Sequence, residues 1–95
     1  MSFRRAAKKD SNHNEITDAF KSLGYSVLDI SQLKNCCDAI VAKSNRTIAI
    51  EIKDGSKVPS ARKLSEGEAT FRDYWRGEWA LIESVNDVIK LDKAA

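Results

Sequence analysis

The sequence predicts an α/β fold with the element order αβββαβα, and three observations carry this prediction. Two β-rich runs, residues 36–43 and 46–53, are separated by only two residues, a spacing typical of a tight hairpin. Ser65 followed by Glu68 is a capping-box pattern that opens a helix. Ahead of these elements, four apolar residues follow the i, i+3, i+4, i+7 spacing of an amphipathic helix: Ile16, Ala19, Phe20 and Leu23.

The elements before the hairpin follow from local signals. Ser11 or Asn12 can cap the first helix, and Gly24 is placed to end it. Residues 25–30 are typical of a strand, and residues 31–35 of a loop. We therefore expect one helix and one strand ahead of the hairpin.

After the hairpin, residues 54–63 hold turn residues, the only proline and a cluster of cations, and are expected to form a loop. The helix that opens at Ser65 is expected to end at Gly77. Residues 79–83 then predict a strand, and residues 84–91 predict a short helix that begins with a second capping pattern.

Length and composition indicate one globular domain. The chain has 95 residues, of which 42% are apolar and 32% charged, with one proline and four glycines, the composition of an ordinary folded protein. Residues 1–10 are expected to form a basic tail and residues 11–95 a single domain. No apolar run approaches the roughly 20 residues of a membrane span, so we expect a soluble, cytoplasmic protein without a membrane partner.

The two cysteines, Cys36 and Cys37, are adjacent in the sequence. In extended backbone their side chains would point to opposite faces, so the pair predicts neither a stapling disulfide nor a zinc site. A reducing compartment fits this usage of cysteine best.

The net charge of +2 is unevenly distributed. Residues 4–9 and residues 53–63 are both basic, and the rest of the chain is acidic. Two basic patches on an acidic body would attract phosphate without making the whole protein basic. The alternative is that these charges are only solvated surface.

The hairpin is expected to bring two carboxylates face to face. If the turn centres on Ser44 and Asn45, Asp38 lies opposite Glu51 on one face of the strands. The same register pairs Lys43 with Arg46, Val41 with Ile48, and Ala39 with Ile50. The other face is apolar and is expected to be core: Cys37, Ala39, Val41, Ile48, Ile50 and Ile52. Directly opposed carboxylates destabilise a sheet unless a cation lies between them.

This pair predicts a divalent-metal site. Two hard oxygen ligands leave positions for a water and a phosphate oxygen, which suits Mg²⁺ or Mn²⁺. Lys53 lies on the same face, two residues beyond Glu51, where its amino group can orient or deprotonate a metal-bound water or balance negative charge in the transition state. The alternative is an exposed face on which Asp38, Glu51 and Lys53 form salt bridges only.

These residues also carry a family resemblance. Cys37-Asp38, followed on the next strand by Glu51-Ile52-Lys53 and preceded by a helix bearing Asn14-Glu15, resembles the PD-(D/E)xK nuclease superfamily. The continuation is similar to the VRR-Nuc branch found in phage and prophage proteins: Glu51 to Gly55, Pro59, Lys63-Leu64-Ser65, an aromatic helix, and Trp79 to Ser84. The resemblance covers about residues 12–92. Cys37 stands where the motif has proline, and the loop just before it lacks the family's glycine.

The resemblance implies a restriction-endonuclease-like αβββαβ core with a mixed sheet flanked by helices. It implies metal-dependent cleavage of DNA phosphodiesters, with activity on branched DNA such as Holliday junctions or flaps, by a homodimer in a bacterial or phage-infected cell. Asp38 and Glu51 would be metal ligands, together with the Ile52 carbonyl. Lys53 would be the catalytic lysine, and Glu15 falls where the family's first-helix acid approaches the metal.

Two acids and the lone histidine have alternative roles. Glu15 stands three residues after Asn12, so it can belong to the metal site or to a capping box. Glu68 has the same ambiguity after Ser65, and there we favour the cap. His13 can act as a proton shuttle, but a histidine at a helix start is more often an exposed polar residue.

The loop after the catalytic strand is expected to contact the DNA backbone through Lys57, Arg62 and Lys63. Four aromatic residues near one helix and strand are expected to be core or subunit interface rather than base-stacking platforms: Phe71, Tyr74, Trp75 and Trp79. Their number in so short a chain favours a homodimer. The alternatives to a nuclease are a catalytically silent nucleic-acid-binding module and a structural subunit that keeps the fold.

Overall fold

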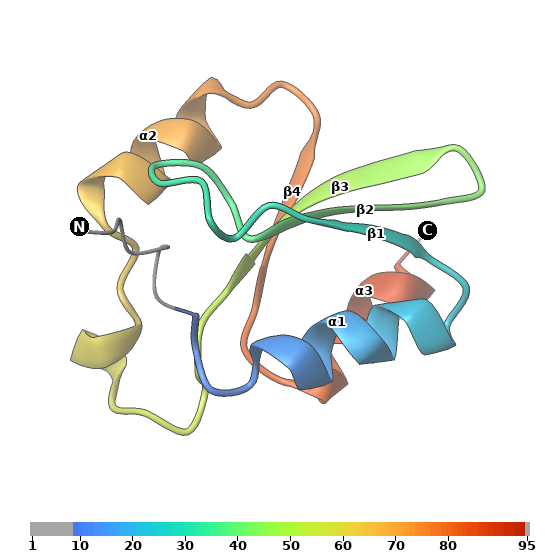
Figure 1. Cartoon of the computed structure of the whole chain (residues 1–95), viewed down its shortest axis with the longest axis horizontal. Coiled ribbons are helices and arrows are strands. Elements are labelled where there is room, and N and C mark those ends of the chain that lie inside the picture. Colours follow the sequence, from blue (N-terminus) through green and yellow to red (C-terminus); the bar gives the residue numbers. More distant parts are fainter. Residues whose placement is uncertain (1–8, 95) are drawn as a thin grey trace, which may run out of the picture.

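The protein is a small α/β domain in which helices flank a four-strand mixed sheet (Figure 1). The structure, a computed structural model, describes residues 9–94. The elements are α1 (His13–Ser22), β1 (Ser26–Asp29), β2 (Ala39–Lys43), β3 (Arg46–Ile52), the 3₁₀ turn η1 (Pro59–Arg62), α2 (Glu66–Tyr74), β4 (Glu78–Ile82) and α3 (Val85–Lys93). The predicted order is confirmed, with η1 added inside the expected loop. Most of the expected basic tail, residues 1–8, lies outside the described residues.

The sheet has the strand order β1-β2-β3-β4. β2 pairs antiparallel with both β1 and β3, and β4 joins β3 in parallel. The predicted hairpin register is confirmed for three pairs: Lys43 with Arg46, Val41 with Ile48, and Ala39 with Ile50. Both turn residues, Ser44 and Asn45, have positive φ angles of 51° and 66°, as a type I′ turn requires.

The prediction that a strand begins at residue 36 is wrong, because β2 begins at Ala39. Asp38 still donates its amide hydrogen to the Ile50 carbonyl at 2.9 Å. Its side-chain Oδ2 then accepts the Ile52 amide hydrogen at 2.7 Å. A carboxylate oxygen of Asp38 therefore replaces a backbone carbonyl as the acceptor. The regular hydrogen-bond ladder between β2 and β3 ends just before Asp38 and Glu51.

The hydrophobic core lies between one face of the sheet and the helices α1 and α3. In Figure 1 these two helices lie together below β1, β2 and β3. The core contains the predicted strand residues and the apolar stripe of the first helix: Ile16, Phe20, Tyr25, Ala39, Val41, Ile48, Ile50, Ile52, Ile82 and Val88. The expected inner face of the hairpin is therefore confirmed.

The start of α1 differs from the expectation. Asn12 stands at the cap position but makes no capping hydrogen bond with its side chain. Its side-chain Nδ2 instead donates to the backbone carbonyl oxygens of Lys53 and Glu83, each at 3.2 Å. These carbonyls lie just past the ends of β3 and β4, so Asn12 joins the two parallel strands to the first helix. A local capping rule could not predict partners 41 and 71 residues away.

His13 is buried, so the expectation of an exposed histidine is wrong. Its Nε2 lies 2.9 Å from Oδ2 of Asp29, at the end of β1. Burial raises the pKa of Asp29, but hydrogen bonds from the Ser31 hydroxyl and amide and from His13 outweigh it and hold that pKa far below its ordinary value. The pair fixes the helix start to the sheet edge beside the loop that leads to Asp38.

Helix α2 stands apart from the core. Its capping box is confirmed, since the Ser65 side chain accepts from the Glu68 amide and Glu68 accepts from the Ser65 amide. The helix ends at Tyr74 rather than at Gly77, and among its residues, all of them described, none is buried. The interpretation of its aromatic residues as core is therefore wrong: Tyr74 is 74% exposed, and Phe71 stacks on Trp75 with 5.5 Å between ring centroids.

No helix within residues 9–94 is long and apolar enough to cross a membrane.

Candidate functional site

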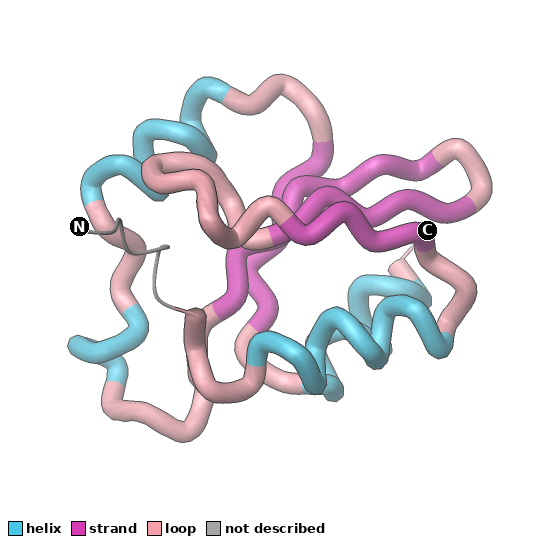
Figure 2. The backbone as a smooth tube through the Cα atoms, viewed as in Figure 1, coloured by secondary structure: helices cyan, strands magenta, loops and turns pink. Residues whose placement is uncertain are grey.

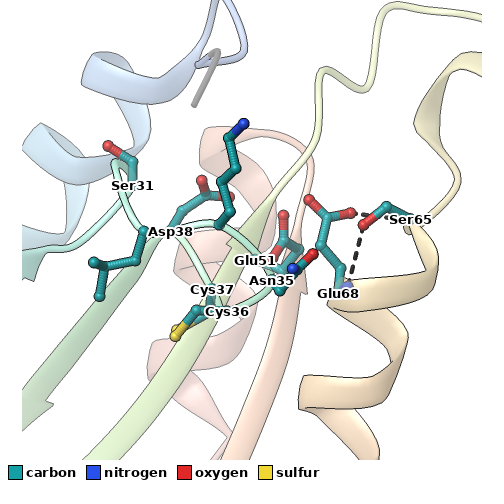
Figure 3. Close-up of a pocket in the computed structure, with 10 residues that line it drawn as sticks. Ser31, Asn35, Cys36, Cys37, Asp38, Glu51, Ser65 and Glu68 are labelled. Atoms are coloured by element: carbon teal, nitrogen blue, oxygen red, sulfur yellow. Dashed lines mark hydrogen bonds between the residues drawn. The ribbon is translucent and has the colours of Figure 1, made fainter. Parts of the chain in front are cut away.

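Two hollows meet at three acidic side chains. Asp38, Glu51 and Glu68 line both hollows, and Figure 3 shows them reaching one pocket from the loop before β2, from β3 and from α2. The second hollow, of about 220 Å³, is also lined by Lys53 and Lys57. A water occupies about 30 Å³ in the liquid, so this hollow has room for a phosphate group and several waters.

The predicted catalytic residues lie together, although they come from different elements. Asp38 lies at the end of the loop before β2, where its hydrogen bond to the Ile52 amide fixes it against β3. Glu51 lies on β3 and is only 3% exposed. Lys53 follows β3 directly, with its Nζ 3.9 Å from Oε2 of Glu51. The burial of Glu51 contradicts an exposed face, although Lys53 forms ion pairs with both Glu51 and Glu68.

The electrostatics of Glu51 are dominated by its burial and by a second carboxylate beside it. Burial raises its pKa well above the ordinary value, and the neighbouring Asp38 carboxylate raises that pKa further. Lys53 acts in the opposite direction but is outweighed. A proton or a metal ion bound between the acids would relieve this repulsion.

Lys53 is held mainly by Glu68 and not by Glu51. Its Nζ donates to Oε1 of Glu68 at 2.8 Å. Burial lowers the pKa of Lys53, but the hydrogen bond and charge of Glu68, with a smaller effect of Glu51, raise it above its ordinary value. The lysine is therefore a fixed ammonium at neutral pH, which suits charge stabilisation better than proton abstraction.

The favoured capping role of Glu68 is confirmed, and the structure adds a contact with Lys53 that the sequence did not predict. The same Oε1 that accepts from Lys53 also accepts from the Ser65 amide at 2.8 Å, as the capping box requires. Burial raises the pKa of Glu68, but the Lys53 hydrogen bond and the Ser65 amide outweigh it and hold the pKa below its ordinary value. One carboxylate thus starts α2 and orients the lysine.

The first turn of α2 is pressed against the loop that carries Asp38. A Cβ atom on Gly67 would overlap the side chain of Asn35. Asn35 itself has a positive φ of 59°, a conformation that asparagine tolerates better than most residues. This close approach lets the loop and the helix form opposite walls of the pocket that Asp38 and Glu51 line.

Asp10 is a site residue that the sequence analysis missed. It lines the second hollow beside Asp38 and Lys53, and Lys9 lines it as well. Burial raises the pKa of Asp10, Lys53 lowers it, and Asp38 adds to the rise. Its only sequence signal is its position two residues before the helix cap, inside the range 1–10 that is expected to form the basic tail.

Glu15 is not in the place that the resemblance implies. It is exposed and lies on a different hollow, with Asp54, Arg62 and Glu83. The reason is the helical phase of α1. Its buried residues are His13, Ile16, Thr17 and Phe20, and at 3.6 residues per turn Glu15 falls on the opposite side of the helix. Asn12 forms no side-chain cap, so a capping box with Glu15 has no support either.

The three basic loop residues differ in their surroundings. Lys57 is exposed and lines the second hollow with Asp38 and Glu51. Arg62 is engaged within the protein, where it pairs with Glu83 at 3.0 Å and donates to the Lys57 carbonyl at 2.8 Å. Lys63 is exposed at the end of η1.

The donor set near Glu51 fits a hard divalent cation with few protein ligands. Asp38 and Glu51 offer carboxylate oxygens, and Ile52 lines the same hollow. Within the described part of the chain, no group of three Asp, Glu, His or Cys side chains is gathered closely enough to hold a metal ion. A cation here would therefore take most of its remaining ligands from solvent or substrate, as Mg²⁺ commonly does.

Comparison with known proteins adds no further constraint on the site. No family model matches the sequence, and neither a curated protein nor a solved structure matches it.

Proposed function

We propose that the protein is a divalent-metal-dependent nuclease that hydrolyses phosphodiester bonds of DNA, with branched DNA as its preferred substrate. The observation that carries this proposal is the convergence of Asp38, buried Glu51 and Lys53 on one hollow that Lys57 also lines. The choice of DNA, and of branched DNA in particular, rests on the resemblance to VRR-Nuc nucleases. The element order and the mixed sheet are compatible with the restriction-endonuclease-like core that this resemblance implies.

In this proposal Asp38 and Glu51 hold the metal with the Ile52 carbonyl. A bound Mg²⁺ or Mn²⁺ would act as a Lewis acid toward the scissile phosphate and lower the pKa of the attacking water. Asp38 is oriented for its role by the Ile52 amide. Lys53, kept charged by Glu68, would stabilise the negative charge that develops on the phosphate oxygens.

One experiment tests the activity directly. Purified protein is incubated with four-way junction, flap, duplex and single-stranded DNA, each with Mg²⁺, Mn²⁺ or EDTA. We expect cleavage of the branched substrates with either metal and none in EDTA. DNA binding without cleavage in any metal would contradict the proposal and favour a silent binding module. Neither binding nor cleavage would favour a structural subunit.

The basic loop predicts how DNA affinity responds to salt. We expect Lys57→Ala and Lys63→Ala each to weaken binding of every DNA sequence alike and to reduce the slope of log K against log salt by about one unit per lost phosphate contact. Arg62→Ala should change the slope less, because Arg62 already pairs with Glu83. Junction-binding titrations at several salt concentrations measure these slopes, and an unchanged slope in the Lys57 and Lys63 double variant would place the DNA path elsewhere.

A further inference from the structure

A further hollow lies along helix α2, on the side of the loop that carries Asp38. It has a volume of about 550 Å³ and is lined by residues of this loop and of the helix: Asn35, Glu66, Gly67, Thr70, Phe71 and Tyr74. We call it the aromatic hollow. Figure 2 shows α2 set off from α1 and α3, so those two helices do not cover it.

The aromatic hollow presents two rings to solvent. Tyr74 is 74% exposed, and Phe71 is partly exposed. Phe71 stacks on Trp75 with an angle of 27° between the rings, and Trp75 is itself fixed because its Nε1 donates to the Glu78 carbonyl at 2.9 Å. The ring of Phe71 is therefore held in place before any ligand arrives, and the ring of Tyr74 lies open beside it.

Polar groups border these rings. The amide of Asn35, the carboxylate of Glu66 and the hydroxyl of Thr70 line the same hollow, and all three residues are exposed. An unpaired nucleobase is a flat ring with hydrogen-bond donors and acceptors on its edge, and proteins bind it by aromatic stacking combined with hydrogen bonds to that edge. An apolar side chain of a protein partner would use the rings but not their polar border.

The aromatic hollow adjoins the acidic pocket. Asn35 lines both, and Figure 3 shows it in the pocket with Glu68. Glu68, which holds Lys53, lies three residues before Phe71 on the same helix, a separation of about 4.5 Å along its axis. Lys34, the exposed neighbour of Asn35, also lines the acidic pocket, where it can pair with a phosphate. A base in the aromatic hollow would therefore place its own strand beside the acids.

We propose that the aromatic hollow binds an unpaired nucleobase of a DNA substrate, which stacks on Tyr74 and Phe71. A base within a duplex is excluded, because its faces are covered by neighbouring bases. This inference rests on the proposed function, from which it takes DNA as the substrate. It narrows branched DNA to forms with unpaired nucleotides near the scissile bond, such as flaps, in preference to fully paired four-way junctions.

The test is equilibrium binding of the full chain in EDTA, measured by fluorescence anisotropy. The probes are a short single strand, the duplex of the same sequence, and an abasic strand that keeps the phosphates but has no bases. We expect Tyr74→Ala to raise the dissociation constant for the single strand at least about 5-fold, in line with the loss of one stacked base, and to change those for the duplex and the abasic strand less than about 2-fold. The slope of log K against log salt should not change, because Tyr74 contacts no phosphate in this proposal.

Two variants serve as controls. Tyr74→Phe keeps the ring and should bind the single strand as the wild type does. Ile89→Ala removes another exposed apolar side chain, one that is 40% exposed on α3, and it should have no effect. Circular dichroism and thermal melting show whether each variant folds. If Tyr74→Ala does not fold, Tyr74→Leu, which has no ring, decides with the same measurement.

Three outcomes would overturn the proposal: no binding of the single strand by the wild type, unchanged single-strand affinity in Tyr74→Ala, or an equal loss of affinity for the abasic strand. If Tyr74→Ala changes only the mass of the protein in light scattering, the hollow belongs to a second copy and the proposal is also overturned. Base-dependent binding without cleavage of any substrate in Mg²⁺ would support the hollow and contradict the nuclease. Cleavage by a wild type whose binding does not depend on Tyr74 would do the reverse.

Discussion

Asp38→Asn, Glu51→Gln and Lys53→Ala are each expected to reduce DNA cleavage by about 10²-fold or more, in line with the loss of one preorganised polar group in an active site, while the protein remains folded. The two acid variants keep the side-chain shape but remove a charged metal ligand. The lysine variant removes the ammonium that Glu68 holds 2.8 Å away. Cleavage rates on a four-way junction, measured with melting temperatures of the same samples, check this expectation.

Glu15→Gln is the matched control for these variants. It is the same chemical change as Glu51→Gln, but Glu15 is exposed and lies on a different hollow. Its cleavage rate should equal that of the wild type. Near-normal turnover of Asp38→Asn or Glu51→Gln would show that the site is assigned wrongly, and loss of activity in Glu15→Gln would restore Glu15 to the metal site.

The second large effect is expected on the free energy of unfolding in the absence of metal, when Glu51 is replaced by glutamine. Burial and Asp38 raise the pKa of folded Glu51 above its ordinary value of 4.5. The folded state therefore holds this proton more tightly than the unfolded state. The stability that results is fully present below pH 4.5 and is lost as the pH rises toward the folded pKa.

Glu51→Gln removes this loss because glutamine does not ionise. In EDTA at pH 8 the variant should be more stable than the wild type by on the order of 2 kcal/mol, and near pH 4 the difference should become small. Added Mn²⁺ should then stabilise the wild type at pH 8 but not the variant. Urea unfolding at the two pH values, with Glu15→Gln as the control, measures the effect. A variant less stable than the wild type at pH 8 would mean that Lys53 already neutralises an ionised Glu51.

The hairpin and its acids could be predicted from the sequence because their cause is local. A two-residue connection at Ser44 and Asn45 leaves one register for the hairpin. Alternation along the chain then predicts that Asp38 and Glu51 share a face, and the two do line one hollow although Asp38 lies just before β2. The capping box at Ser65 is similarly contained in four residues. Where the local geometry depends on a few neighbouring residues, the sequence pattern is sufficient to predict it.

The N-terminal part of the site could not be predicted in the same way. Asn12 and His13 have their partners on β1 and past the ends of β3 and β4. These contacts depend on how α1 lies on the finished sheet, and they carry Asp10 into the hollow while they leave Glu15 outside it. Composition alone assigned Asp10 to a basic tail, because no periodic signal marks the residues before a helix.

The shared carboxylate of Glu68 links the orientation of the lysine to the folding of a helix. No residue of helix α2 is fully buried. An element with little buried surface is expected to open locally at a lower free energy than the sheet. When its first turn opens, Glu68 leaves Lys53 even though Asp38 and Glu51 remain in place on the sheet. The ammonium then regains its rotamer freedom in a molecule that is still folded. We therefore expect the local opening of α2, and not global unfolding, to set the fraction of molecules in which Glu68 holds Lys53.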